Sequence, residues 1–313
     1  MTKAKLGAAV SKGTGVLLAA ACLLTPTGTA AGKDLECVEA VLPTADSLRR
    51  QRGRVVVFGE THGTQESPAL VGDLACHLAV DGRVLVGIEL PRWLDEDIAA
   101  FVAGELDVAT LTTAERPVMR ADGSPLAGSE QQWWQETRDG RSSRAMLGLL
   151  TRVRELVRSG LEVETVAFDD ASLWFEGEEE PANTREELMA TNVARKWGAG
   201  DFDYALMLTG GFHARRSPEG RRRTMVDWLP ADDVFSVHIR FRRGAAWTCR
   251  LSREGALPAN CGAHALPETL GDGPLLTLTP LPSADFDAEI LLPAANPSPP
   301  AVSGDGILRS TIK

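Results

Sequence analysis

Short runs of β-branched and apolar residues alternate along the chain with longer segments of helical periodicity. Four runs predict strands, at residues 55–58, 84–88, 163–168 and 204–208. Apolar residues three and four apart predict helices at about 66–80 and 142–158, and Asn183 with Glu186 forms a capping pattern that opens a third helix to about Trp197. This alternation is typical of an α/β fold with a mainly parallel central sheet and crossover helices.

Two further segments complete the predicted architecture. Residues 92–140 form a long insertion containing Trp93, Trp133 and Trp134, which we expect to be partly helical and to cap one end of the sheet. Runs at 234–241 and 246–251, joined by Arg242-Arg243-Gly244, predict a C-terminal β-hairpin at a sheet edge. We expect one α/β domain at 32–292 and, because the sequence from Pro293 is rich in Pro and Ser, a flexible tail at 293–313.

The N-terminal segment has the layout of a secretory signal peptide. Lys3, Lys5 and Lys12 precede a short apolar run at 16–24, and small residues follow up to Ala31. The sequence therefore predicts cleavage after residues 1–31 and export to the periplasm or the extracellular space. Ala19 stands where lipoprotein acylation sites usually carry a larger aliphatic residue, so anchoring through Cys22 is not expected.

Four cysteines remain after this processing, which suggests two disulfides in an oxidising compartment. Cys249 and Cys261 flank a short loop that contains Pro and Gly, and we expect them to pair. Cys37 would then pair with Cys76. The absence of CxxC and of Cys/His ligand spacing excludes a zinc finger.

Composition excludes several classes of protein. Of the 313 residues 43% are hydrophobic, as in globular proteins, so a disordered chain is excluded. The net charge of -10 argues against nucleic acid as a partner, because a phosphate backbone would be repelled. No apolar run approaches the roughly 18 residues of a transmembrane helix. The expected partner is a small-molecule or peptide substrate, and the oligomeric state is left open.

Charged residues follow each of the four predicted strands. In an open parallel sheet, ligands bind beyond the carboxyl ends of the strands, because the loops converge there. Carboxylates gathered at one edge repel one another unless a metal, a proton or a substrate uses them. The residues at these ends are Glu60 and His62, then Glu89, then Asp169 and Asp170, and finally His213.

Three of these strand ends resemble a known superfamily. GETHG at 59–63, GIELP at 87–91 and GGFHARR at 210–216 are similar to motifs of the superfamily that unites erythromycin esterases, ChaN-type haem-uptake lipoproteins and Tiki/TraB-type proteins. Tiki-type members carry two Gly-x-x-His motifs and a Glu, which correspond here to His62, His213 and Glu89. The resemblance covers about residues 52–216.

The resemblance implies two alternative chemistries. In the first, His62, His213 and Glu89 (or Glu60) hold Zn²⁺, Mn²⁺ or Fe²⁺, and the metal activates water. In the second, His62 is a general base held by Glu60 or Glu89 without metal. The esterases carry GEATHG, which is one residue longer than GETHG here. Asp169 would support the site as a further carboxylate.

A basic segment follows the second histidine. Arg215, and more weakly the cluster at 221–223, can bind an anionic group or an oxyanion, although a solvated helix face explains the cluster equally well. Before the helix at 142–158, Asp139 or Ser142 is expected to be the N-cap, and Arg141 can point toward the cleft.

Haem binding is the alternative from a different functional class. Some ChaN-type members use an exposed Tyr as the iron ligand, whereas Tyr204 lies in an apolar strand pattern that indicates core packing. The sequence lacks GxSxG and HExxH, which argues against a serine esterase and a zincin. It therefore predicts an exported hydrolase that activates water at a two-His/carboxylate cleft to cleave an ester or amide. The alternative is a haem or iron uptake protein without catalysis.

Overall fold

The computed structural model describes residues 36–120, 122–170, 184–217, 222–250, 260–267, 273–281 and 285–302. They belong to one compact unit, Leu35–Lys313. The predicted signal peptide lies outside the described residues.

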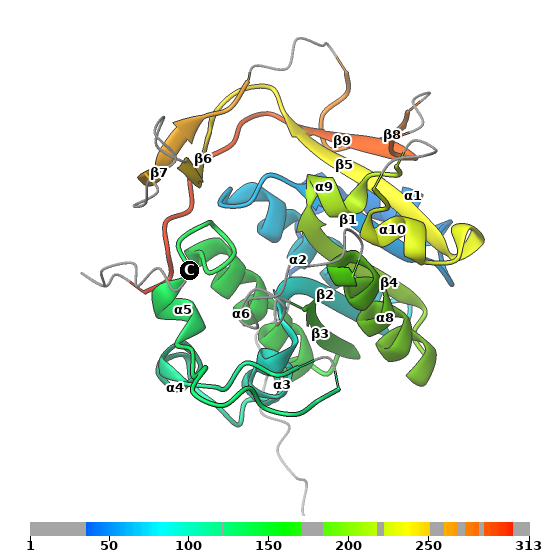
Figure 1. Ribbon diagram of the computed structural model, residues 1–313. Helices are drawn as coiled ribbons and strands as arrows, with labels where there is room; N and C mark the ends of the chain where they lie inside the picture. The colour runs from blue at the N-terminus through cyan, green and yellow to red at the C-terminus, as the bar shows by residue number, and fades with distance from the viewer. Residues whose placement is uncertain are drawn as a thin grey trace, which may run out of the picture. The chain divides into compact units, whose positions relative to one another are not determined.

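A seven-stranded sheet forms the centre of the unit, with the strand order β3-β2-β4-β1-β5-β9-β8 (Figure 1). All of its pairings are parallel except the one between β8 and β9, which confirms the predicted α/β class. The strands are β1 (Val55–Glu60), β2 (Val84–Pro91), β3 (Val163–Asp169), β4 (Tyr204–Gly210), β5 (Val234–Phe241), β8 (Leu278–Pro280) and β9 (Ala288–Leu292).

Helices cover both faces of the sheet, which explains why its strands are nearly continuous apolar runs. Val56 and Phe58 of β1 belong to a hydrophobic cluster with residues of α1, α2, α3 and α6, whereas Val55 and Val57 belong to a second cluster with residues of α8 and α10. Figure 1 shows these two groups of helices on opposite faces of the sheet. These helices are α1 (Leu42–Arg49), α2 (Glu66–Ala79), α3 (Asp95–Ala103), α6 (Arg144–Arg158), α8 (Thr184–Ala199) and α10 (Met225–Trp228).

The insertion at 92–140 is partly helical, as predicted, and it also protects the edge of the sheet. It contains η2 (Arg92–Leu94), α3, α4 (Val108–Thr113) and α5 (Trp133–Glu136). The Asp95 carboxylate accepts a hydrogen bond of 2.7 Å from the backbone N–H of Ala167 in the edge strand β3. An edge-strand donor that could pair with another chain is thereby satisfied.

A C-terminal hairpin is present, but its strands differ from those predicted. β6 (Ala245–Arg250) pairs with β7 (Asn260–Ala265) in a separate two-stranded sheet, and β5 lies inside the central sheet between β1 and β9. The chain leaves the central sheet at Gly244, where φ is +129° and an added Cβ would lie 2.1 Å from the Ala295 carbonyl oxygen. The two predicted disulfides, Cys37–Cys76 and Cys249–Cys261, are both present.

The first part of the predicted tail is bound to the body of the domain. Ser298 is 1% exposed, and its backbone N–H donates to the Gly63 carbonyl at 2.7 Å. Arg144 donates to the Pro299 carbonyl, and Ala301 donates to the Ser142 carbonyl. Residues 303–313 lie outside the described part. No helix in the described ranges is both long and apolar enough to cross a bilayer.

Candidate active site

The carboxyl ends of four neighbouring strands bring the predicted residues together. Glu60 ends β1 and Asp169 ends β3, while Glu89 lies near the end of β2. His62 follows β1, and His213 follows β4 in the short helix α9 (Gly211–Ala214). The side chain of His62 is 21% exposed, whereas the other four are 10% exposed or less, so His62 is the most accessible of the five.

Both ring nitrogens of His62 face carboxylates. Nδ1 lies 3.0 Å from Glu60 Oε1, and Nε2 lies 3.3 Å from Glu89 Oε2. Burial disfavours the charged ring, but the charges and hydrogen bonds of Glu89 and Glu60 outweigh burial and raise the pKa of His62 to about 10. At neutral pH His62 is therefore an imidazolium that donates from both nitrogens.

His213 lies between a carboxylate and a guanidinium. Its Nδ1 lies 2.8 Å from Glu186 Oε2, and its Nε2 lies 3.2 Å from Nη1 of Arg185. Nε2 also lies 3.6 Å from Oε1 of Glu89. Because a guanidinium only donates hydrogen bonds, the tautomer with its proton on Nδ1 donates to Glu186 and accepts from Arg185. The two histidines therefore have different surroundings, since both ring nitrogens of His62 face carboxylates.

Glu186 belongs to this cluster, which the sequence did not indicate. We expected it to form a capping pair with Asn183 at the start of its helix, and Asn183 lies outside the described residues. The Glu186 side chain is fully buried, and it accepts hydrogen bonds from His213 and from the backbone N–H of Met225. The capping pattern placed Glu186 at a helix start but carried no sign that a distant histidine lies opposite it.

Glu89 occupies the centre of the cluster. Its Oε2 accepts from the Thr209 hydroxyl and from the Gly210 backbone N–H, both at 2.7 Å, and its Oε1 accepts from Arg185 at 3.1 Å. Burial alone would raise the pKa of Glu89, but the neighbouring His213, His62 and Arg185 lower it well below its ordinary value. Glu89 is therefore a carboxylate that organises the site rather than a base.

Two buried arginines join the carboxylates to one another. Asp169 accepts from Arg185 at 2.8 Å and from Arg141 at 3.0 Å, so it anchors both guanidinium groups. Burial opposes the charge on these arginines, but the surrounding carboxylates outweigh it and raise both pKa values. Arg141 points into the cluster as anticipated, whereas Arg185 was not anticipated. Ser143, rather than Asp139 or Ser142, caps α6.

The rings of the two histidines converge over Gly210. A Cβ added there would lie 3.0 Å from His62 Nε2, 3.5 Å from Glu89 Oε2 and 3.6 Å from His213 Cδ2. A side chain at this position would crowd the His62 ring, so the glycine lets the ring lie close to the backbone of β4.

Two residues considered in the sequence lie outside this cluster. Arg215 is exposed, and its guanidinium lies 5.2 Å from the ring centroid of Phe212 rather than among the buried carboxylates. Tyr204 is 4% exposed within β4, which agrees with core packing.

The cluster does not fit a divalent metal held by His62, His213 and Glu89. Nδ1 of His62 lies 3.0 Å from Glu60 Oε1, and Nε2 of His213 lies 3.2 Å from Nη1 of Arg185. A dication there would lie beside the guanidinium groups of Arg185 and Arg141, which would repel it. Across the described ranges, no three or more His, Cys, Asp and Glu side chains are arranged to hold a metal ion.

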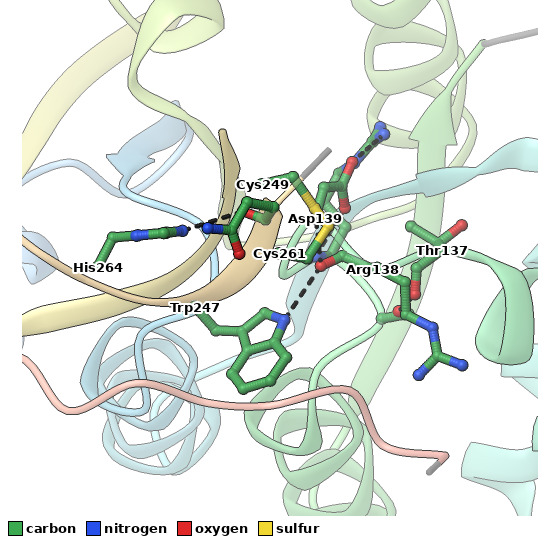
Figure 2. The surroundings of a disulfide bond; sticks show 10 residues. Thr137, Arg138, Asp139, Trp247, Cys249, Cys261 and His264 are labelled. Carbon is green, nitrogen blue, oxygen red and sulfur yellow. Dashed lines mark hydrogen bonds and ion pairs between the residues drawn. A yellow bond between two sulfur atoms is a disulfide. The ribbon is translucent and has the colours of Figure 1, made fainter. Parts of the chain in front are cut away.

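The disulfide-bonded hairpin touches the two loops that carry site residues. Trp247 donates its backbone N–H to the Gly63 carbonyl at 2.9 Å and its indole N–H to the Arg138 carbonyl at 3.2 Å. Figure 2 shows this indole contact beside the Cys249–Cys261 bond, with Asp139 next to it. One residue therefore ties the loop after His62 to the loop before Arg141.

Replacing Trp247 by Phe is expected to lower stability by about 1 kcal/mol and kcat by about 2- to 10-fold, because one partly buried hydrogen bond is lost while an aromatic ring is kept. Trp228→Phe is the matched control, since the indole N–H of Trp228 has no hydrogen-bond partner among the residues that the structure describes. Urea unfolding and ester turnover measure both effects. Equal stability and equal turnover for Trp247→Phe and wild type would show that the indole hydrogen bond does not support the two loops.

Comparisons with known proteins establish the fold. No protein-family model matches the chain, and no curated sequence matches it. Among solved structures, a mutant of the erythromycin esterase EreC in its open conformation matches with a TM-score of 0.51 at 13% identity, covering 86% of this chain and 98% of that chain. A succinoglycan biosynthesis protein matches with a TM-score of 0.50 at 9% identity, covering 82% and 97%. The chain therefore has the fold of the erythromycin esterase EreC, as the resemblance of its strand-end motifs predicted.

Proposed function

We propose that this protein is an exported hydrolase that cleaves an ester or amide without a metal ion, with His213 as general base and His62 as general acid. The observation that carries the proposal is the different surroundings of the two histidines, which meet over Gly210. His62 lies between two carboxylates, whereas Nε2 of His213 faces the guanidinium of Arg185. From the sequence we expected His62 to be either a metal ligand or the general base. A pKa of about 10 supports the acid role instead, because His62 already carries its proton at neutral pH.

His213 supplies the base. A water that accepts a hydrogen bond from Arg185 and donates to Nε2 of His213 would replace their direct 3.2 Å contact. When that water attacks the substrate carbonyl, its proton passes to Nε2. Glu186 holds the Nδ1 proton at 2.8 Å and stabilises the imidazolium that forms, as the carboxylate of a catalytic triad does.

His62 completes the reaction as the acid. Its Nε2–H is held only by the 3.3 Å contact with Glu89, and the ring is partly exposed, so this proton can pass to the leaving oxygen or nitrogen. Glu60 fixes the ring through Nδ1. Arg141 and Arg185 place two positive charges where the carbonyl oxygen becomes negative, and buried donors of this kind are worth about 3–4 kcal/mol each in other hydrolases.

The experiment measures turnover of 4-nitrophenyl esters by the purified protein before and after treatment with EDTA, followed by titration with haem. We expect turnover that EDTA does not reduce. Turnover that EDTA abolishes and Zn²⁺ restores would overturn metal independence. Absence of turnover together with a Soret band on adding haem would replace the hydrolase by the haem-carrier alternative.

A further inference from the structure

An exposed aromatic side chain lies directly beside the proposed base. Phe212 is 40% exposed, although large apolar side chains are usually buried, and it precedes His213 in α9. Its ring meets the His213 ring edge to face, with the centroids 5.4 Å apart. A substrate group that packs on Phe212 would therefore lie close to His213, the proposed base.

Two arginines lie against this ring. The guanidinium carbons of Arg215 and Arg222 lie 5.2 and 5.7 Å from its centroid. Arg222 also approaches Glu186 Oε1 at 3.7 Å, so this group reaches the carboxylate that orients His213. We call Phe212, Arg215 and Arg222 the arginine rim.

Arg215 of the arginine rim has fewer carboxylate partners than the buried Arg141 and Arg185. Arg141 and Arg185 are each hydrogen bonded to carboxylates on more than one side. Within the described ranges Arg215 forms no ion pair, although the chain carries a net charge of -10. Exposed cations near a cleft attract anions and pair with carboxylate or phosphate through charge-assisted hydrogen bonds.

We infer that the arginine rim binds an anionic group of the substrate, a carboxylate or a phosphate carried on an apolar body that rests on Phe212. The protein would then prefer anionic esters to neutral ones. This inference rests on the proposed function, because it places the scissile bond at His213 while the anion lies at the rim.

The test compares two substrates with the same leaving group and chain length, 4-nitrophenyl hexanoate and the mono-4-nitrophenyl ester of adipate, which differ by one carboxylate. We expect kcat/KM to be at least about 10-fold higher for the adipate ester, since one charge-assisted hydrogen bond suffices for this ratio. The ratio should fall toward one in the double variant Arg215→Gln/Arg222→Gln and with rising NaCl. Arg243→Gln, at the exposed turn before β6, should leave it unchanged.

Calorimetric titration with adipate and with hexanoate separates this inference from the proposed function. Adipate binding that is lost in the double variant would support the arginine rim even if neither ester were hydrolysed, in which case the hydrolase proposal alone would fail. Equal kcat/KM for both esters, or a preference that survives in the double variant, would overturn the inference.

Discussion

Replacing His213 by Asn is expected to lower kcat for ester hydrolysis by about 10²- to 10⁴-fold while the protein remains folded. The Asn amide can still donate to Glu186, as Nδ1 of His213 does at 2.8 Å. No basic nitrogen would remain opposite Arg185, so an attacking water could not give up its proton. The variant thus removes the proposed base but keeps a hydrogen bond to Glu186.

Steady-state kinetics and urea unfolding of His213→Asn should be read beside His264→Asn, in which a histidine bonded only to a carbonyl of its own strand is changed. The control is expected to match wild type in both measurements. Full turnover by His213→Asn would rule out the base role, and unfolding of the variant would show that the ring is needed for structure.

Raising the pH from about 6.5 to about 10 should remove a stabilising contribution that depends on His62. The folded protein holds this proton up to a pKa of about 10, whereas the unfolded chain releases it near 6.5. The contribution is complete below pH 6.5 and is lost as the pH rises through 10. Because the folded state binds the extra proton, the free energy of unfolding falls by up to about 1.4 kcal/mol per pH unit in this interval.

The difference in unfolding free energy between wild type and His62→Gln isolates this effect from other titrating groups. It should be largest at about pH 6.5 and shrink steadily at higher pH. The kcat/KM of wild type should likewise fall above about pH 10, as the acid loses its proton. A difference between the two proteins that stays constant with pH would mean that His62 does not carry the raised pKa.

The strands could be predicted because both faces of the sheet are buried, which makes each run apolar throughout. The four site residues at the strand ends followed from this, since Glu60, Glu89, Asp169 and His213 share one edge. The cluster residues that lie on helices could not be predicted in this way. Arg185 lies in α8 and meets Asp169 and Glu89 through tertiary packing, for which local periodicity carries no signal.

The error in the hairpin has a similar origin. The runs that become β5 and β6 are consecutive and are joined by a glycine turn, as in a hairpin. β5 stays in the central sheet because β1, much earlier in the chain, and β9, much later, both pair with it in parallel. Strand partners set by long connections cannot be inferred from neighbouring residues alone.

The position of β4 between β1 and β2 determines when the site can form during folding. β4 pairs in parallel with both strands, and each of them is far away in the sequence. Such long-range parallel pairing forms slowly, because long loops must close before any contact stabilises them. His213 and Gly210 reach Glu89 and His62 only when β4 has inserted. Recovery of the proposed ester hydrolysis after denaturation is therefore expected to follow insertion of β4 between β1 and β2.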